Sequence, residues 1–267
     1  MMTAVRCRSL AIVLLATASA RGDDISQPHV HAGIFKAYKP GPPKSVGLTG
    51  RPGDSSACTV MALPASKHSP KGSMRCQSIQ EVEAPASVVW ELLLDFQNYP
   101  RFIKGISSCK PYSSRRTITG GKVVSARYQC NVGTFKVCYS LEHQYEPLQH
   151  SMVWHLDYSR KSDVFDSVGY WYVEPCGPDR ARVYYTTDSL LPAWIPAPLR
   201  KTFTKIAMKA ATQQLEPACA ELVAKRTGKR SLRLPAVGRF GLPKVQMPEL
   251  PRFPKVGSVP RLRQALA

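Results

Sequence analysis

The hydrophobic positions between residues 76 and 226 change period along the chain. After a loosely alternating stretch over 76–83, apolar side chains recur at helical spacing, at Val89, Leu92, Leu93 and Phe96. This spacing predicts an amphipathic helix that starts near Pro85, where a missing N–H costs nothing, and runs through Phe96. Asn98-Tyr99-Pro100 should break it, and a second, short helix or turn is expected over 101–106.

From residue 108 the period falls to two, which is typical of β-strands. Turn residues such as Gly120-Gly121 divide this part of the chain, and the strands are expected at 108–113, 121–131, 134–145, 150–159, 163–174 and 181–190. The connections are too short for crossovers, so neighbouring strands should pair antiparallel.

A Pro-rich hinge over 191–198 leads to a last amphipathic helix over 199–226, whose apolar face includes Leu199, Phe203, Ile206 and Ala210. Pro217 should kink this helix, because Pro cannot donate to the carbonyl of Gln213. One helix cannot cover a sheet of about seven strands, so the sheet should curve around it and leave an internal space. We therefore expect an α+β domain over 76–226, with a ligand cavity between a curved antiparallel sheet and a long C-terminal helix.

The formal net charge of +19 is unevenly distributed along the chain. Residues 1–75 carry 10 basic and 3 acidic groups, residues 76–224 carry 16 and 14, and residues 225–267 carry 11 and 1. The central domain is thus nearly neutral. Because affinity for phosphate should come from the folded surface, we predict no nucleic-acid partner.

The N-terminal flank has the features of targeting sequences. Residues 1–20 combine Arg6 and Arg8 with a short apolar run and the cleavage pattern Ala18-Ser19-Ala20, which predicts a secretory signal peptide. Residues 21–75 are basic, poor in acids after residue 25 and without periodicity, so they resemble a transit peptide. Together the two parts resemble the leader of plastid proteins in algae whose plastids lie inside the secretory system. A secreted protein with a disordered linker is the alternative, and a mitochondrial presequence fits less well.

The C-terminal flank, 227–267, is basic and Pro-rich, which predicts a disordered tail. It is either only solvated or docked on an anionic membrane surface, where each basic residue contributes about 1 kcal/mol.

The cysteines and histidines do not predict a metal site. The chain has 8 Cys and 6 His, without a Cys-x-x-Cys pair and without ligand-spaced clusters, so zinc is not expected. Too few Cys fall in the domain for a disulfide framework, and we expect buried free thiols there. No sequence feature calls for a cofactor.

The opening of the domain resembles a known family. Residues 83–90, Glu-Ala-Pro-Ala-Ser-Val-Val-Trp, and residues 95–103, Asp-Phe-Gln-Asn-Tyr-Pro-Arg-Phe-Ile, are similar to the first helices of the START-like (helix-grip) superfamily. The nearest branch contains polyketide cyclases/dehydrases and coenzyme Q-binding START domains. The resemblance covers 76–226 and implies a helix-grip fold, with two short helices after the first strand, that holds an apolar molecule such as a lipid, isoprenoid quinone or pigment.

The sequence supplies aromatic side chains for such a pocket. Alternate strand positions and the apolar face of the last helix give the predicted ligand-binding set, which is Tyr128, Tyr139, Trp154, Trp171, Tyr185, Phe203 and Ile206. The alternative is that they fill a closed core. Slipping a strand by one residue would also exchange its faces.

Catalysis is the second class of function, because some members of the resembled family cyclise or dehydrate polyketides. The candidate acids and bases are His143, His155, Asp157 and Asp166. His155 and Asp157 share a strand face opposite Trp154, and a solvated strand face accounts for the set. No nucleophile or phosphate-binding motif is present, so we favour a non-enzymatic binding protein.

Overall fold

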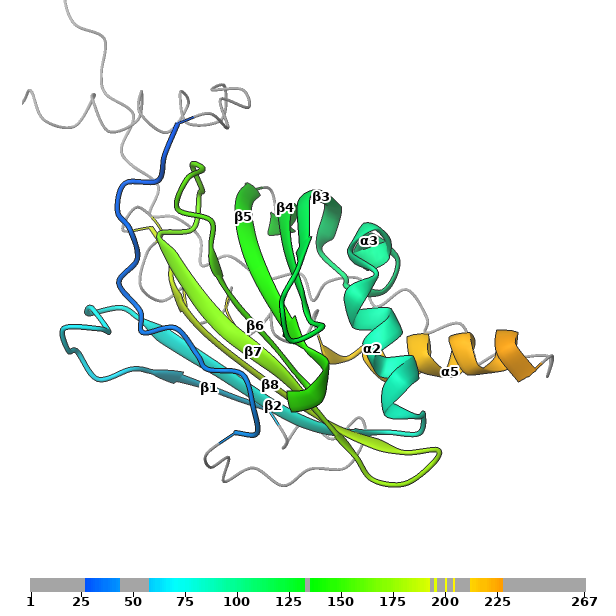
Figure 1. The fold of residues 1–267 in the computed structure, drawn as a ribbon. Helices are drawn as coiled ribbons and strands as arrows, with labels where there is room; N and C mark the ends of the chain where they lie inside the picture. The colour runs from blue at the N-terminus through cyan, green and yellow to red at the C-terminus, as the bar shows by residue number, and fades with distance from the viewer. Residues whose placement is uncertain are drawn as a thin grey trace, which may run out of the picture. The chain divides into compact units, whose positions relative to one another are not determined.

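One antiparallel sheet of eight strands forms the framework of the domain (Figure 1). The computed structural model describes residues 27–43, 58–132, 135–192 and 212–227, together with Ile195, Arg200 and Thr204. The strands are β1 (Cys58–Ala62), β2 (Met74–Val82), β3 (Ile106–Arg116), β4 (Lys122–Val132), β5 (Phe135–Glu146), β6 (Ser151–Leu156), β7 (Asp166–Pro175) and β8 (Ala181–Leu190). Their order across the sheet is β1-β2-β8-β7-β6-β5-β4-β3.

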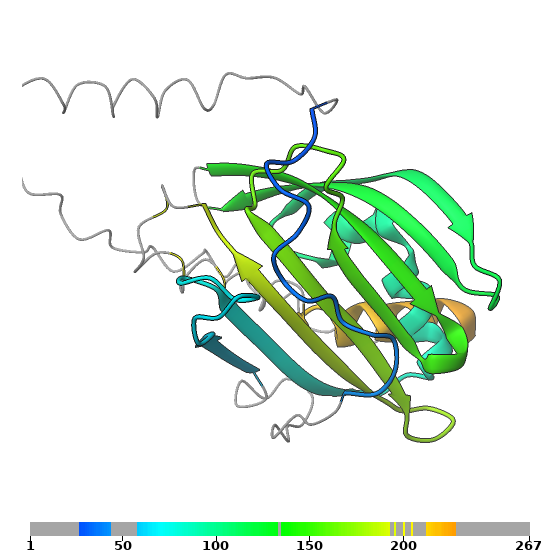
Figure 2. The same cartoon turned by 60° about the vertical axis from the view of Figure 1, so that its left-hand side comes forward.

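The described helices lie on one side of this sheet (Figures 1 and 2). They are α2 (Ala86–Leu94), α3 (Tyr99–Phe102) and α5 (Leu215–Thr227), and a 3-10 turn, η2 (Phe96–Asn98), joins the first two. Leu93 of α2 and Leu215 of α5 are fully buried in the same core cluster as strand residues such as Met152. We call the helix-covered side of the sheet the inner face and the other side the outer face.

The predicted α+β class is confirmed, with differences at the element boundaries. The second short helix begins at Tyr99, earlier than expected, and Pro100 occupies its first turn, where the missing N–H is harmless. The strand predicted over 150–159 ends at Leu156, because Asp157 starts a turn in which its carbonyl accepts the N–H of Arg160 at 3.1 Å. The next strand therefore starts at Asp166 rather than at residue 163.

The last helix is interrupted close to the predicted kink. Thr212 is helical, Gln213 and Gln214 form a turn, and α5 begins at Leu215. Pro217 thus falls in the first turn of α5, and the interruption lies at Gln213 and Gln214. Residues 205–211, like the predicted signal peptide and almost all of the tail, lie outside the described residues.

The sheet has one strand more than expected, and it comes from the segment predicted as a leader. β1 pairs antiparallel with β2, from Cys58 opposite Ser78 to Ala62 opposite Met74. The N-terminal boundary predicted at residue 76 is therefore wrong, since β1 and the first residues of β2 precede it. Five residues without a clear alternation are too short a signal for periodicity to detect.

Residues 27–43, which we call the strap, lie across the outer face (Figure 2). The backbone N–H groups of Ile34 and Phe35 donate to Oδ2 of Asp166 at 2.7 and 3.0 Å. Phe35 is buried against Val168 and Leu190. These contacts contradict the disordered reading of this part of residues 21–75. Hydrogen bonds from backbone groups and single apolar contacts leave no periodic pattern in a sequence.

Two further strap contacts involve β6 and β8. Tyr38 donates to Oδ2 of Asp188 at 3.1 Å, and its ring meets that of Tyr170 edge-on, with centroids 4.9 Å apart. The N–H of Gly41 donates to Oγ of Ser151 at 2.9 Å. The strap thus follows the outer face from β7 to β8 and β6.

Candidate functional site

The inner face carries a continuous strip of aromatic rings over five strands. The strand pairing places Tyr128 opposite Tyr139 and Trp171 opposite Tyr185. Trp154 lies between these two pairs and belongs to the same inner core cluster. The five predicted strand residues therefore share one face, as the alternation required. Their contact with a ligand stays a prediction.

Ring contacts join the members of this strip. Tyr128 and Tyr139 stack with centroids 5.2 Å apart and planes 3° apart. At the other end, the ring centroid of Tyr185 lies 5.7 Å from that of Trp154 and 4.4 Å from that of Trp171. Such pairs contribute about 0.5–1.5 kcal/mol beyond their buried area, so the rings stabilise one another within the core of the inner face.

His143 joins the two halves of the strip and brings a polar group to its centre. Its ring centroid lies 5.8 Å from that of Tyr128 and 6.2 Å from that of Trp154. Nε2 lies 3.0 Å from the hydroxyl oxygen of Tyr128, and Nδ1 lies 3.2 Å from the carbonyl oxygen of Val124. A neutral imidazole satisfies both contacts if Nδ1–H donates to the carbonyl and the tyrosine hydroxyl donates to Nε2.

Burial controls the protonation of this pair. Loss of solvation lowers the pKa of His143 to about 3, and it raises the pKa of Tyr128 well above its usual value. Both side chains are therefore neutral at physiological pH.

The close approach of Trp154 to the sheet depends on Gly169. A Cβ atom at this position would lie 2.3 Å from the indole ring of Trp154 and 2.4 Å from the carbonyl oxygen of Thr186. Gly169 stands opposite Trp154 in the pairing of β6 and β7. Only a residue without a side chain lets the indole lie flat on β7.

The two predicted site residues on the last helix, Phe203 and Ile206, lie outside the described residues. Their neighbour Thr204 is described and buried. The thiol of Cys76, on the inner side of β2, lies 3.7 Å from the carbonyl oxygen of Thr204. This contact puts one point of the predicted helix over the inner face. The volume of the cavity expected there stays a prediction.

The solvated strand face expected for the candidate acids and bases is wrong for two of them. His143 is buried on the inner face, and Asp166 is fully buried beneath the strap. His155 does lie on the outer face, partly exposed and 3.7 Å from Glu142. Asp157 follows β6 and accepts a hydrogen bond from the hydroxyl of Tyr112 at 2.5 Å. Only His143 of this set reaches the aromatic strip.

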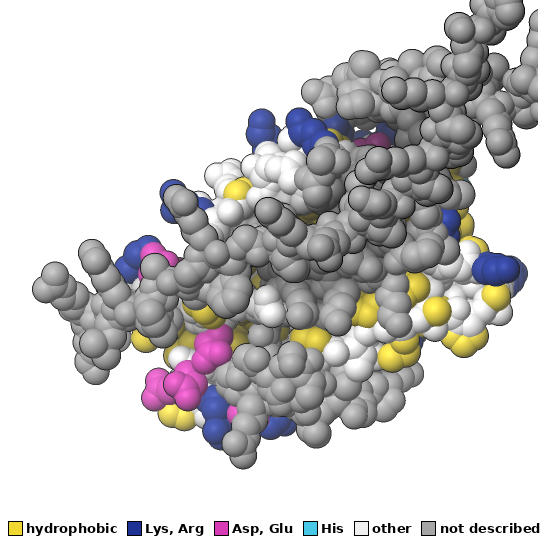
Figure 3. Space-filling model, turned by 180° about the vertical axis from the view of Figure 1, so that it is seen from behind, with side chains coloured by type: hydrophobic (Ala, Val, Ile, Leu, Met, Phe, Trp, Pro, Cys, Tyr) yellow, Lys and Arg dark blue, Asp and Glu magenta, His cyan; other side chains and the backbone are white. Residues whose placement is uncertain are grey.

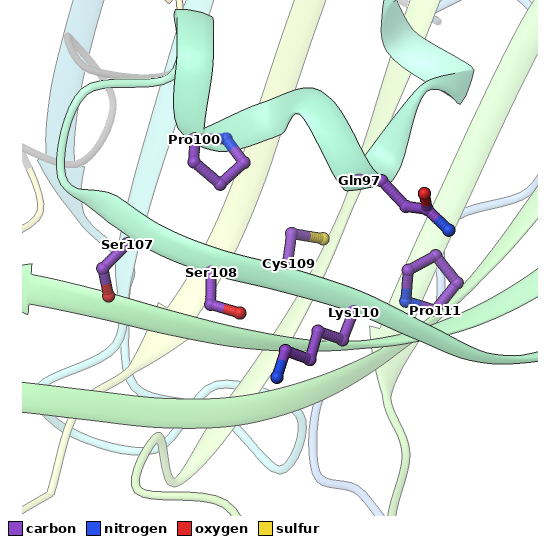
Figure 4. Close-up of a pocket in the computed structure, with 7 residues that line it drawn as sticks. All are labelled: Gln97, Pro100, Ser107, Ser108, Cys109, Lys110 and Pro111. Atoms are coloured by element: carbon purple, nitrogen blue, oxygen red, sulfur yellow. The ribbon is translucent and has the colours of Figure 1, made fainter.

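A pocket of about 460 Å³ lies at the edge of the sheet, between β3 and the η2–α3 segment (Figure 4). It is lined by Gln97, Pro100, Ser107, Ser108, Cys109, Lys110 and Pro111. Only Cys109 among them is buried, and burial raises the pKa of its thiol to about 12. The pocket thus has a mixed polar and apolar lining, is largely open to solvent and holds no reactive thiolate, unlike the enclosed apolar cavity expected beneath the last helix.

Among the described residues no three His, Cys, Asp or Glu side chains are grouped to bind a metal ion. None of the helices in the described ranges has the length and hydropathy to span a membrane. On the face seen in Figure 3, the Lys and Arg side chains of the described residues stand in separate groups near the edges.

Comparison with known proteins gives the family. The profile of the family described as polyketide cyclase / dehydrase and lipid transport matches residues 82–216. The chain belongs to this family, which confirms the resemblance noted in the opening helices. No curated protein matches the sequence.

Solved structures similar to this chain have low sequence identity. The ZhuI aromatase/cyclase from Streptomyces is 14% identical over 58% of this chain and 96% of that one, with a TM-score of 0.48. A START superfamily protein from Mycobacterium smegmatis is 19% identical over 55% and 98%, with a TM-score of 0.47. A STAR-related lipid transfer protein from Xanthomonas axonopodis is 12% identical over 62% and 95%, with a TM-score of 0.48.

Proposed function

We propose that this protein binds an apolar small molecule against the inner face of the sheet and carries or protects it without chemical change. Lipids, isoprenoid quinones and pigments are the candidate ligands. The observation that carries this proposal is the aromatic strip from Tyr128 to Trp171, with the neutral pair of His143 and Tyr128 at its centre. An apolar surface with few polar groups suits a molecule that has an apolar body and one polar end.

Two buried donors support a polar end on the ligand. Nε1 of Trp90 and Nε2 of Gln80 are buried and have no hydrogen-bond partner among the described residues. A buried donor without a partner costs about 1–3 kcal/mol, and a carbonyl oxygen of a ligand would remove this cost. A quinone or another ketone provides such an oxygen.

The direct test is to purify the full chain without detergent and to analyse its organic extract by mass spectrometry. We expect a near-stoichiometric apolar molecule. Titration with a short-chain ubiquinone should also quench the tryptophan fluorescence and saturate, because Trp154 and Trp171 lie in the strip. An empty extract together with an unsaturable titration would refute the binding function.

A matched pair of variants tests whether the inner face is responsible. Tyr128→Phe removes only the hydroxyl bonded to His143, and loss of one such hydrogen bond should weaken ubiquinone binding about fivefold. Tyr172→Phe makes the same change on the outer face and should leave the affinity unchanged. Equal effects of the two substitutions would exclude the strip as the binding surface.

A polyketide cyclase or dehydratase is the second candidate function. It is favoured by the position of His143, the candidate base that reaches the inner face. An imidazole whose pKa is lowered to about 3 is, however, a weak proton acceptor at neutral pH. Turnover of an aromatic polyketide that disappears in His143→Gln would favour the enzyme over the carrier.

We further propose that the leader directs the chain to a plastid, with secretion as the alternative. The strap and β1 are packed on the sheet, so a cleavable leader would have to end before residue 27. Each of the seven cysteines in the described ranges is a free thiol, which supports a reducing destination. Fusing residues 1–26 and residues 1–75 to a fluorescent reporter tests this proposal. Reporter in the medium would support secretion.

The basic tail is proposed to add affinity for anionic membranes. Its contribution can be measured by vesicle sedimentation of the full chain and of a variant in which every Lys and Arg after Thr227 is replaced by Gln. Equal sedimentation of the two proteins would dismiss the tail as a membrane anchor.

A further inference from the structure

Two turns at one end of the sheet expose large apolar side chains to solvent. Ile118, in the connection between β3 and β4, is fully exposed, and Leu148, in the turn η3 (Pro147–Gln149) between β5 and β6, is 83% exposed. Both turns lie at the same end of the sheet (Figure 1). Single exposed apolar residues are ordinary, but two on neighbouring turn tips form a local surface. We call Ile118, Leu148 and the basic residues beside them the apolar tip.

The β3–β4 turn is held firmly against the end of β5. The hydroxyl of Thr119 donates to Oε2 of Glu146 at 2.7 Å, and the N–H of Gly121 donates to Oγ1 of Thr117 at 2.8 Å. A Cβ atom at Gly121 would lie 2.3 Å from the carbonyl oxygen of Tyr145, so only glycine permits this approach. Ile118 is therefore presented on a fixed turn beside η3, and its exposure is built into the turn.

The charge around the apolar tip is positive. Arg116 and Lys122 stand opposite each other at the base of the β3–β4 turn, and both are exposed. Arg115 is 64% exposed and lies 3.8 Å from Glu142, a loose contact that it shares with His155. Glu146, at the end of β5, is buried and accepts hydrogen bonds from Thr119 and Gln144.

We propose that the apolar tip docks this protein on the surface of an anionic lipid bilayer. Ile118 and Leu148 would enter the interface between headgroups and acyl chains, while Arg115, Arg116 and Lys122 would lie near the lipid phosphates. Apolar side chains flanked by basic ones are the combination that anionic membrane surfaces bind. The opposite charge of the bilayer is the reason to choose it over a second protein as the partner. The proposal is independent of the ligand on the inner face and of the basic tail.

The test uses the full chain, with every Lys and Arg after Thr227 replaced by Gln so that the tail cannot mask the tip. Sedimentation is measured with vesicles of phosphatidylcholine alone and with vesicles that also contain about 30% of the anionic lipid phosphatidylglycerol. We expect binding to the anionic vesicles only. Ile118→Ser with Leu148→Ser should lower the partition coefficient about tenfold. Arg116→Gln with Lys122→Gln should lower it about 25-fold, since each charge contributes about a factor of five.

The control is Val30→Ser, because Val30 is 77% exposed in the strap, away from the apolar tip, and should not affect sedimentation. All these positions are exposed, so thermal unfolding should be the same in every variant. Wild-type sedimentation of the Ile118/Leu148 variant would overturn the proposal, and so would the absence of binding to either kind of vesicle. An equal loss in the Val30 variant would also overturn it, since exposed apolar area anywhere would then suffice.

Discussion

The two faces of the sheet bury different kinds of side chain. On the inner face, β7 and β8 contribute Trp171 and Tyr185, whose rings contact each other and carry few polar atoms. On the outer face the same two strands contribute Asp166 and Asp188, buried carboxylates whose partners come partly from the strap. Polar side chains on the outer face are buried by the chain's own N-terminal segment, whereas the aromatic rings of the inner face are buried in the core that the sheet shares with α2 and α5.

The outer face is held together by directed polar contacts. Asp166 accepts four hydrogen bonds, from the N–H groups of Ile34, Phe35 and Ser167 and from the hydroxyl of Tyr158. Asp188 makes a two-pronged ion pair with Arg75, with both N···O distances 2.7 Å. The hydrogen bond to Asp188 is the main reason that the pKa of Arg75 is raised. Because the hydrogen bonds to Asp166 are directional, they fix the position of the strap on the sheet.

The largest expected effect is on the outer face. Asp166→Ala should lower the free energy of unfolding by about 4 kcal/mol, because it leaves several donors under the strap without an acceptor. Urea unfolding followed by circular dichroism measures the change. Asp179→Ala, in the exposed β7–β8 turn, is the control and should change stability by less than about 0.5 kcal/mol. A similar small value for Asp166→Ala would mean that the strap does not seal this face.

The apolar part of the strap should contribute slightly less. Phe35→Ala should cost about 3 kcal/mol, since it removes a buried ring packed on Val168 and Leu190. It should also speed trypsin cleavage after the exposed Lys36. Ala37→Ser, at an exposed position of the strap, is the matched control. An unchanged cleavage rate in Phe35→Ala would show that the packing of Phe35 does not keep the strap in place.

On the inner face the sharpest probe is Gly169→Ala. The new methyl group would meet the indole of Trp154, and we expect a loss of about 2 kcal/mol in stability together with a shift in tryptophan fluorescence. Ser167→Ala changes the same strand and face without this clash and should preserve the spectrum. An unchanged spectrum in Gly169→Ala would show that the indole can move away, so that the strip is not rigid.

The smallest effect near neutral pH is a pH dependence of stability that comes from His143 on the inner face. Burial lowers the pKa of His143 from 6.5 to about 3, so the unfolded chain binds a proton that the folded chain excludes. Above about pH 6.5, His143 therefore does not lower the free energy of unfolding. Between about pH 6.5 and 3, that free energy should fall by about 1.4 kcal/mol for each unit that the pH decreases. Chemical unfolding at pH 7.5, 6 and 5 is the measurement. These conditions span the usual pKa of histidine, about 6.5.

His155, on the outer face, provides the control for His143. His143→Gln should remove this part of the pH dependence, while His155→Gln, on the outer face of the next strand, should keep it. If the two variants have the same profile, the buried imidazole does not govern acid sensitivity.

The hydrophobic periodicity of the chain predicts the order of the elements, because it reflects which side chains are buried. The strands from β3 to β8 and the helix α2 were predicted within a few residues of their bounds. The alternation also placed Tyr128, Tyr139, Trp154, Trp171 and Tyr185 correctly on a common face, since side chains in a strand alternate strictly. The family followed from the motifs around Pro85 and Pro100.

The contacts that each face of the sheet makes depend on the whole fold and have no local signal in the sequence. The strap and β1 have no periodic signal in the sequence, because backbone hydrogen bonds and isolated side chains hold them in place. Some partners are also distant along the chain: Phe35 and Asp166 are more than 100 residues apart. His143 and Asp166 were expected to be solvated, and both are buried. Whether a polar side chain is buried depends on what covers its face, and that covering comes from distant parts of the chain. Local sequence fixes which way a side chain points, whereas the fold decides what it meets there.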